Sequence, residues 1–270
     1  MKPSNFSPFQ NVISGLLRWL GRQTPNIRYV RAISNRLLKP LHSVLGFEGG
    51  VVDVLGFKMR LEPKECVDGN LWFAPHLYDR AEISFLLERM PQDGVFVDVG
   101  ANIGFWSLYF AHVFPLAKIC AIEANPATFL VLRENIEINA FRNIMAFHVG
   151  VSDNVGELPL YCNDTGNRGG DSFADYADNR NRCVMVAVKP LANILASAGI
   201  ERVDVMKMDI EGFEERVLTR FFAEAPRGLW PHFICAEVSH VPKVVSLLQK
   251  VGYRLALSAT ENCVLELRQG

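Results

Sequence analysis

Cysteine patterns typical of metal sites or disulfide scaffolds are missing from this sequence. The six cysteines are scattered, no CxxC pair occurs, and no histidine cluster has the spacing of metal ligands. We therefore expect no metal site of this kind, and reduced thiols in a cytoplasmic protein. The chain also has no apolar run of about eighteen residues, and its N-terminus lacks the basic, apolar and small-residue order of a signal peptide.

A strong excess of either charge is missing as well. The 270 residues carry a net charge of -1, so the whole molecule offers no general attraction to nucleic acid. With 49% hydrophobic and 21% charged residues, the composition is typical of a globular protein that needs no disulfides. The charge is uneven, because residues 1–47 hold seven Lys and Arg and no acid. The remainder has 21 basic and 29 acidic residues, a balance of -8.

We expect the basic N-terminal region, residues 1–48, to be an extension to a domain that spans residues 49–270. Apolar residues at helical spacing predict two amphipathic helices in the extension, over 12–20 and 27–38. Three arrangements are open: a cap on the domain, a homodimer contact, or a peripheral contact with an anionic membrane surface. We favour the cap, because Gly15 and the short first helix make a weak membrane anchor.

The domain is expected to open with a hairpin over 50–60, a loop-rich stretch over 61–80 and a helix over 81–89. The next segment, Val95–Gly104, reads VFVDVGANIG and predicts a buried strand, a tight turn and a helix start. An acid near the end of a buried strand needs donors, which favours a cationic or hydroxyl-bearing ligand. Glycine in the turn permits positive φ and the close approach of that ligand. The candidate cofactor-binding residues here are Asp98, Gly100, Ala101, Asn102 and Gly104.

The spacing of this turn bears on the kind of cofactor. A dinucleotide site has the pattern GxGxxG, whereas here Asn102 stands at the second glycine position, which argues against a nicotinamide-dependent oxidoreductase. The pattern Asp-x-Gly-x-Asn-x-x-Gly instead resembles motif I of class I S-adenosylmethionine-dependent methyltransferases. That cofactor presents an amino-acid end to the loop. Besides a dinucleotide site and a methyltransferase site, the segment could be a structural turn between strand and helix that binds no ligand.

Two further strand ends supply candidate cofactor contacts. A strand over 118–123 ends at Glu123, where this class of fold places an acid on the ribose hydroxyls. Glu123 could instead cap the following helix, over 127–139. A strand over 144–151 is followed by Asp153, which could accept from an adenine amino group or serve only in a turn. The candidates from these two ends are Glu123, Ala124, Asn125, Ser152 and Asp153.

The pattern of strands and helices predicts a seven-stranded, mostly parallel Rossmann-like sheet with helices on both faces. An insertion over 156–188 adds two short strands, 157–161 and 184–188, around a polar loop over 162–183 that we expect to be functional. The seven strands of the main sheet are expected over 95–99, 118–123, 144–151, 203–208, 233–238, 253–258 and 263–268. Because parallel strands share one carboxyl edge, the acids that end four of these strands should gather on one rim. They are Asp98, Glu123, Asp209 and Glu237.

Four segments together resemble the FkbM-type methyltransferase family: VFVDVGANIGFWSLYFA, AIEANP, VGVSD and VDVMKMDIEGFEERVL. The resemblance covers roughly Gly50–Leu267. It implies S-adenosylmethionine-dependent O-methylation of a hydroxyl, often on a sugar or secondary metabolite. The family commonly has the run Leu-Asp-Asp-Leu before the last of these segments. This chain has Leu191-Ala192-Asn193-Ile194 instead.

Methyl transfer from a sulfonium is an in-line displacement, and an alcohol acceptor must also lose its proton. Asp209 is the first candidate for the base or for orienting the acceptor, with Glu211, Glu237 and His240 behind it. A loop histidine that faces solvent is the alternative for His240. Mg²⁺ held by the three carboxylates is an alternative that the spacing does not require. A catalytically silent binding protein with the same fold is also open.

Overall fold

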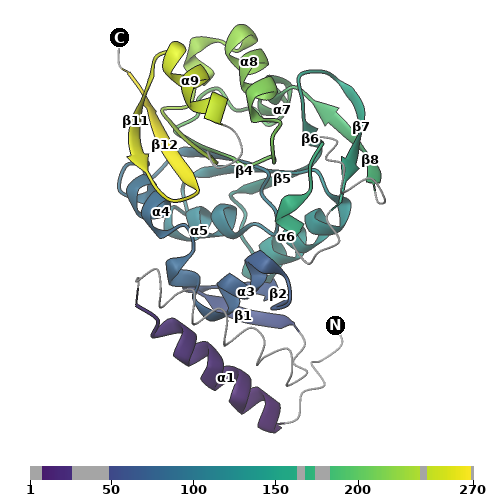
Figure 1. The fold of residues 1–270 in the computed structure, drawn as a ribbon, viewed down its shortest axis with the longest axis vertical. Coiled ribbons are helices and arrows are strands. Elements are labelled where there is room, and N and C mark those ends of the chain that lie inside the picture. The colour runs from purple at the N-terminus through teal and green to yellow at the C-terminus, as the bar shows by residue number, and fades with distance from the viewer. Residues whose placement is uncertain (1–7, 26–48, 163–167, 174–182, 238–241, 269–270) are drawn as a thin grey trace. The chain divides into compact units, whose positions relative to one another are not determined.

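The computed structural model describes residues 8–25, 49–162, 168–173, 183–237 and 242–268 (Figure 1). These fall into two compact units, and each is described by itself. The first comprises residues 1–80 and 164–169, and the second comprises residues 81–163 and 170–270. The expected helix over 27–38 lies outside the described residues. Within the described ranges, none of the helices has the length and apolar character that crossing a bilayer requires.

In the described part of the first unit, a hairpin packs with the helices α1 and α3 and the short helix η1. Leu17 of the first helix is buried, and Gly21 lies so close to α3 that a Cβ there would be 2.3 Å from the carbonyl oxygen of Phe73. The hairpin was predicted from the sequence, but it belongs to this unit together with the N-terminal helix. The elements are α1 (Pro8–Arg22), β1 (Gly50–Val54), β2 (Phe57–Leu61), α3 (Cys66–Phe73) and η1 (Pro75–Leu77).

The prediction of a loop-rich stretch over 61–80 was wrong, because α3 lies within it. Five of the eight residues in α3 are buried, so the helix shows no apolar stripe at a period of 3.6. Its first turn is held from outside the helix, since the Asp68 carboxylate accepts the backbone N–H of Glu62 at 2.8 Å. The helix is therefore fixed by tertiary contacts that a periodicity analysis does not detect.

The second unit is organised around a seven-stranded sheet with the order β11-β12-β10-β9-β3-β4-β5. The five strands from β10 to β5 are parallel, and β12 runs antiparallel to both β10 and β11. This arrangement confirms the predicted fold class. The strands are β3 (Val95–Val99), β4 (Lys118–Glu123), β5 (Ile144–His148), β9 (Val205–Met208), β10 (Phe233–Glu237), β11 (Tyr253–Ser258) and β12 (Asn262–Leu267).

The strand predicted over 144–151 was too long. It divides at Val149, after which Gly150 and Val151 leave the main sheet and pair with the insertion. The insertion thus forms a separate sheet of order β6-β8-β7, and its two predicted strands are confirmed. Its strands are β6 (Gly150–Val151), β7 (Gly156–Tyr161) and β8 (Cys183–Lys189).

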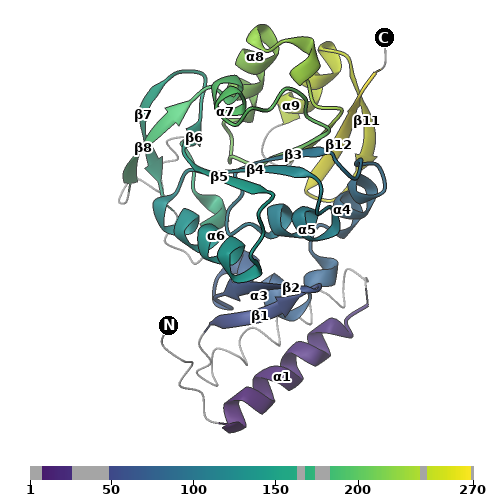
Figure 2. The ribbon, with the colours of Figure 1, turned by 180° about the vertical axis from the view of Figure 1, so that it is seen from behind.

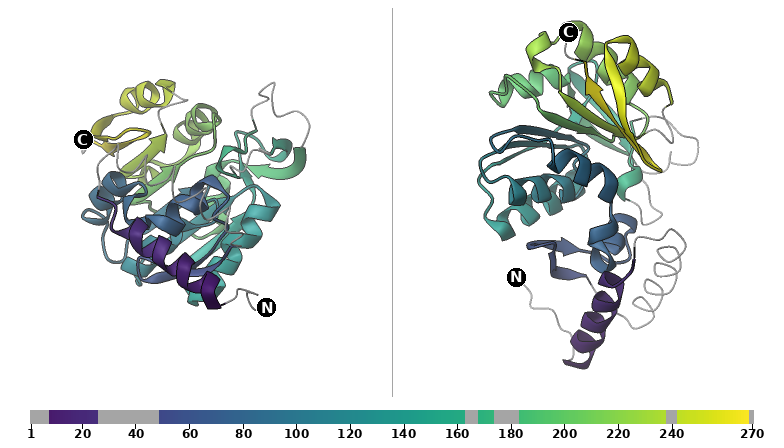
Figure 3. Two further views of the ribbon diagram at one scale, coloured as in Figure 1. Left: turned by 60° about the horizontal axis from the view of Figure 1, so that its bottom comes forward. Right: turned by 90° about the vertical axis from the view of Figure 1, so that its left-hand side faces the viewer.

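Helices cover both faces of the main sheet. In Figures 1 and 2, α4, α5 and α6 lie on one face and α7, α8 and α9 on the other. The right-hand view of Figure 3 shows the strands between these two layers. The helices are α4 (Arg80–Leu87), α5 (Phe105–Val113), α6 (Pro126–Asn139), α7 (Leu191–Ser197), α8 (Glu214–Glu224) and α9 (Pro242–Lys250), with the short turns η2 (Arg168–Gly170) and η3 (Arg227–Leu229).

The two faces are packed differently. An aliphatic core joins alternate residues of β3, β9 and β10 to the helices α7, α8 and α9. The opposite face carries an aromatic stack between β3 and α5. The Phe110 ring lies 4.3 Å from Phe96, 5.9 Å from Trp106 and 6.2 Å from Phe114 between centroids. Phe110 is thus the central member of this stack.

Replacing Phe110 with Ala should lower the free energy of unfolding by about 3–5 kcal/mol, because the stack would lose its central ring and leave a cavity. Chemical denaturation monitored by circular dichroism measures this change. Leu130→Ala on α6 is the control, since Leu130 is 64% exposed and should shift stability by no more than about 0.5 kcal/mol. Equal effects of the two substitutions would contradict the assignment of Phe110 to the core.

Candidate active site

The four predicted acids do lie at one edge of the sheet. The strands β4, β3, β9 and β10 are consecutive neighbours and parallel, so their carboxyl ends meet at the same edge. The chain order changes direction at β3, which has β4 on one side and β9 on the other, and ligands bind at such switch points. Carboxylate oxygens of Asp209, Glu211 and Glu237 lie within 4.8 Å of one another. His240 lies outside the described residues.

The turn after β3 passes directly against the end of β9. Gly100 has φ +77°, and a Cβ at this position would lie 1.9 Å from the carbonyl oxygen of Asp209. Its N–H and that of Ala101 both donate to the carbonyl of Ile122 on β4, at 3.0 and 2.9 Å. The close approach that requires glycine is therefore to the protein's own backbone. The turn is fixed between β4 and β9 before any ligand binds.

The helix that follows this turn also begins at a glycine that packing requires. Gly104 has φ +94°, and a Cβ there would lie 2.5 Å from the Leu132 side chain and 2.6 Å from Leu108. Asn102, two residues earlier, has φ +51°, a conformation that asparagine tolerates better than most residues. Contacts within the protein thus explain why glycine is needed at positions 100 and 104. The residues of this turn that could contact a cofactor with their side chains are then the polar ones.

Asp98 is 1% exposed, and only one of its two carboxylate oxygens accepts hydrogen bonds among the described residues. Its Oδ2 accepts the Ser107 backbone N–H at 3.1 Å and the Ser107 hydroxyl at 2.6 Å, while its Oδ1 is buried and has no hydrogen-bond partner among the described residues. Burial raises the pKa of Asp98, and the neighbouring Lys207 opposes that shift. Asn102 Oδ1 is a second buried acceptor for which the described part of the chain provides no donor. Each of these oxygens is an acceptor of the kind that the ammonium group of S-adenosylmethionine requires, and Ser107, which sequence reasoning missed, orients the first.

Glu123 joins the loops that follow β3 and β4. Its Oε2 accepts the N–H of Asn102 and its Oε1 accepts the N–H of Asn125, both at 2.8 Å. Burial raises the pKa of Glu123 to about 7, although these two hydrogen bonds lower it. A carboxylate has about four acceptor positions, so each oxygen retains one for a ribose hydroxyl. The ribose contact stays a prediction, with a carboxylate already held in place for it.

The alternative role for Glu123, capping α6, belongs to Asn125. The Asn125 Oδ1 accepts the N–H groups of Ala127 at 2.8 Å and Thr128 at 3.3 Å. Its Nδ2 donates to Asp171 of the insertion at 2.5 Å. The side chain of Asn125 is thus committed to structure, so any cofactor contact here would use the backbone of residues 124 and 125. The Ala124 carbonyl accepts from His148 at 3.2 Å.

The candidate adenine contact, Asp153, already has two partners. Its Oδ2 lies 2.7 Å from the Arg216 guanidinium, and its Oδ1 accepts the Ser152 hydroxyl at 3.1 Å. Burial opposes the charged form, but the hydrogen bonds from Arg216 and Ser152 outweigh it and lower the pKa of Asp153. An adenine amino group would have to share these oxygens with Arg216 and Ser152. The adenine role stays a prediction.

The connection between β9 and α8 is held by a glutamate that sequence reasoning missed. Glu214 is fully buried, and its two carboxylate oxygens accept the N–H groups of Ile210 and Gly212 at 2.9 Å each. Burial raises the pKa of Glu214. The loop includes Glu211 at φ +53° and Gly212 at φ +97°. Since Glu214 satisfies the loop amides, the structure assigns no helix-capping role to Asp209.

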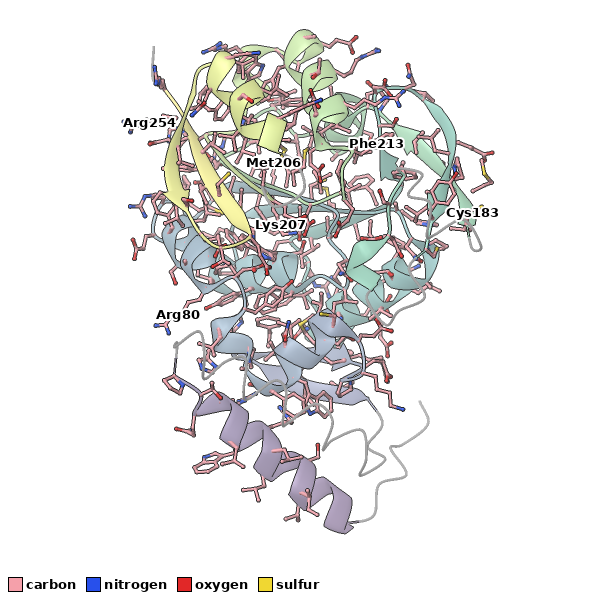
Figure 4. The ribbon with its side chains drawn as sticks, viewed as in Figure 1. Arg80, Cys183, Met206, Lys207, Phe213 and Arg254 are labelled. Atoms are coloured by element: carbon pink, nitrogen blue, oxygen red, sulfur yellow. The ribbon has the colours of Figure 1, made fainter. Side chains whose placement is uncertain are left out.

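Asp209 instead pairs with a buried lysine. The Nζ of Lys207 donates to Asp209 Oδ2 at 2.8 Å, and the lysine side chain is only 8% exposed. Figure 4 labels Lys207 in the region of the main sheet. Lys207 is the register partner of Asp98 on the adjacent strand, and its Nζ lies 5.9 Å from the centroid of the Trp106 ring. One ammonium group therefore pairs with the acid proposed for catalysis and, from the adjacent strand, also favours the charged form of Asp98. A lysine two residues before the acid, on the same strand face, was the available sequence signal.

A seven-stranded sheet in which β12 runs antiparallel to the other six strands, with helices on both faces, is the Rossmann-like methyltransferase fold. Residues 98–255 match the Methyltransferase FkbM domain. The chain belongs to this family of methyltransferases, as the sequence resemblance indicated. Membership also supports S-adenosylmethionine as the cofactor. Asp98, Asn102 and Glu123 are the residues that would hold it.

Named relatives agree with this assignment. The chain is 33% identical over 174 residues to Methyltransferase sdnD of Sordaria araneosa, covering 54% of this chain and 64% of the relative. It is 30% identical over 147 residues to Methyltransferase 1 of Beauveria bassiana, covering 47% and 58%. The match thus spans less than two thirds of either relative. A third relative, 31-O-demethyl-FK506 methyltransferase FkbM of Streptomyces tacrolimicus, is 30% identical over 212 residues, covering 65% and 78%.

Solved structures with a similar fold are distant in sequence. TYW2 of Pyrococcus horikoshii, solved in complex with MeSAdo, aligns with a TM-score of 0.45 and 19% identity, covering 88% of this chain and 83% of that one. The putative transferase PH0793 of Pyrococcus horikoshii aligns with a TM-score of 0.44 and 16% identity, covering 94% and 97%.

The raised pKa of Glu123 predicts a pH dependence of stability. The folded protein holds the proton up to about pH 7, whereas the unfolded chain releases it near 4.5, so stability should fall as pH rises through this window. Glu123→Gln has no titrating group and should lack this component. Urea denaturation of both proteins at pH 5, 6, 7 and 8 measures it. Parallel pH profiles for the two proteins would show that Glu123 does not titrate there.

Proposed function

We propose that this methyltransferase transfers the methyl group of S-adenosylmethionine to a hydroxyl of a small molecule or glycan, such as a sugar or a secondary metabolite. The observation that carries the proposal is the Asp209 carboxylate at the end of a central strand. Lys207 binds its Oδ2 at 2.8 Å, which leaves Oδ1 to face an acceptor. The name of one relative specifies an O-demethylated compound, which supports oxygen as the acceptor atom.

The cofactor supplies an electrophilic methyl group on a sulfonium, and the protein's residues do the rest. Asp98 Oδ1 and Asn102 Oδ1 would accept from the ammonium group of the cofactor, and Glu123 would accept from its ribose hydroxyls. Asp209 Oδ1 would take the proton of the acceptor hydroxyl when that oxygen receives the methyl group supplied by the cofactor. A positioned base of this kind contributes about 10²- to 10⁴-fold to the rate. Glu211, Glu237 and His240 stay candidates for a supporting role.

A divalent metal on Asp209, Glu211 and Glu237 is the alternative use of the same acids. The carboxylates are close enough to share an ion. We favour the base, because the Lys207 ammonium already compensates the charge of Asp209 and would repel a second cation. Loss of transfer after EDTA treatment, with recovery on adding Mg²⁺, would favour the metal.

Cofactor binding is the first test. At a pH above 7, where Glu123 is ionised, S-adenosylhomocysteine should bind the wild type with a micromolar Kd. Glu123→Ala should weaken binding roughly tenfold or more, because a charge-assisted bond contributes about 1.5–3 kcal/mol. Isothermal titration calorimetry measures both values. Wild-type protein that binds no S-adenosylhomocysteine, or an unchanged Kd in the variant, would contradict the cofactor assignment.

The role of Asp209 is tested by Asp209→Asn, which keeps the shape and removes the charge. The variant should bind S-adenosylhomocysteine within about threefold of the wild type, whereas the turnover number should fall by about 10² or more. Turnover is measured with methyl-labelled cofactor and a panel of monosaccharides, glycosides, polyols, phenols and 31-O-demethyl-FK506.

Melting temperature, Kd and turnover are measured on one preparation. Together they distinguish a role of Asp209 in the chemical step from a structural role. A variant that is destabilised but fully active per folded molecule would remove Asp209 from the chemical step. A wild type that binds cofactor but turns over no member of this panel would favour the catalytically silent binding protein.

A further inference from the structure

The segment Gly170–Phe173 of the insertion is attached to both sides of the acid rim. On one side, Asp171 accepts from the Asn125 amide, which lies in the loop after β4. On the other side, the Ser172 hydroxyl donates to the carbonyl of Glu211 at 2.6 Å, in the loop after β9. A short piece of the insertion thus links the loop that we assign to the cofactor with the loop that carries the catalytic acids.

This segment is itself firmly held. Ser172 is 1% exposed, and its backbone pairs with Tyr161 of β7 through two hydrogen bonds, of 2.9 and 3.1 Å. The ring of Phe173 lies 5.6 Å from that of Phe213 and packs against Gly150, where a Cβ would come within 2.4 Å of it. The hydroxyl of Ser172 is therefore presented to Glu211 from a fixed backbone, anchored by β7 and by an aromatic contact.

Glu211 is the residue that needs such support. Its φ of +53° is uncommon for a residue with a side chain, and backbone of this kind persists only where its surroundings hold it. Glu214 fixes the amides on either side of Glu211, and the Ser172 hydroxyl fixes its carbonyl. With that conformation in place, the Glu211 carboxylate lies beside those of Asp209 and Glu237.

We propose that Ser172 is a positioning residue for the methyl-transfer reaction: through the Glu211 carbonyl it holds the acceptor-side carboxylates in their working arrangement. This inference rests on the proposed function, because it assigns the acid rim to the acceptor. It also explains how an insertion remote in sequence contributes to the site. The Ser172 hydroxyl contacts the protein backbone of the acid loop, so the effect of Ser172 on chemistry is indirect.

The test compares Ser172→Ala with Ser197→Ala. Ser197 lies at the end of α7 and donates to the Ile194 carbonyl at 2.7 Å, so the control removes the same kind of bond away from the rim. Hydrogen–deuterium exchange should rise about two- to tenfold in peptides covering residues 209–213 of Ser172→Ala, as expected for one lost hydrogen bond. The same peptides should be unchanged in Ser197→Ala.

Activity provides the second measurement. Ser172→Ala should bind S-adenosylhomocysteine within threefold of the wild type, while its turnover number on the best acceptor of the panel falls at least fivefold. Unchanged exchange over residues 209–213, or raised exchange with full turnover, would overturn the proposal. So would a rise in exchange spread over the whole sheet together with a lower melting temperature, since that indicates a general structural role.

The cofactor measurement separates this inference from the proposed function. Wild-type protein that binds no S-adenosylhomocysteine contradicts the proposed function, whatever Ser172→Ala does. The exchange comparison needs neither cofactor nor acceptor. It therefore decides on its own whether Ser172 holds the Glu211 loop.

Discussion

The contact between Gly100 and the carbonyl of Asp209 is the constraint on which the site depends. Two adjacent parallel strands, β3 and β9, end in loops that pass each other with no room for a Cβ. The acid of the cofactor turn and the proposed catalytic acid are thereby fixed in relation to each other. Because a shift of about 1 Å in reacting groups can reduce a rate about 10²-fold, a backbone contact of this kind bears directly on catalysis.

Hydrogen bonds from backbone N–H groups to a buried glutamate hold the loops on both sides of that contact. Glu123 and Glu214 each use both carboxylate oxygens to accept two backbone N–H groups, one pair around the cofactor turn and the other in the acid loop. Burial raises the pKa of both glutamates, so each bond to a backbone amide offsets part of the desolvation. The buried pair of Lys207 and Asp209 extends this pattern. The acids at this edge of the sheet therefore differ in their roles, because Glu123 and Glu214 hold the backbone of the loops and Asp209 is the acid that we propose to face the acceptor.

The sequence predicted the strands well, because buried parallel strands are short apolar runs and their ends were marked by acids. The rim followed from the rule that parallel strands share a carboxyl edge. Glu214 was missed because its role depends on hydrogen bonds to backbone groups that periodicity does not reveal. Strand alternation places Lys207 on the same face as Asp209 but does not show that the two side chains pair. The helix α3 was missed because it is buried on several sides. Ser172 could not be placed from the sequence, since 39 residues separate it from Glu211.

Methyl transfer explains why so much of this structure fixes loops and so little supplies reactive groups. A base contributes about 10²- to 10⁴-fold, whereas good positioning of the reacting atoms can reach effective molarities of about 10⁵–10⁸ M. A sulfonium donor is already reactive, so a rigid frame that aligns donor and acceptor has more to contribute than a strong base. Glu123, Glu214 and Ser172 all act on backbone groups of the loops at the rim. In the proposed mechanism, residues of this kind therefore contribute to the rate as much as Asp209 does.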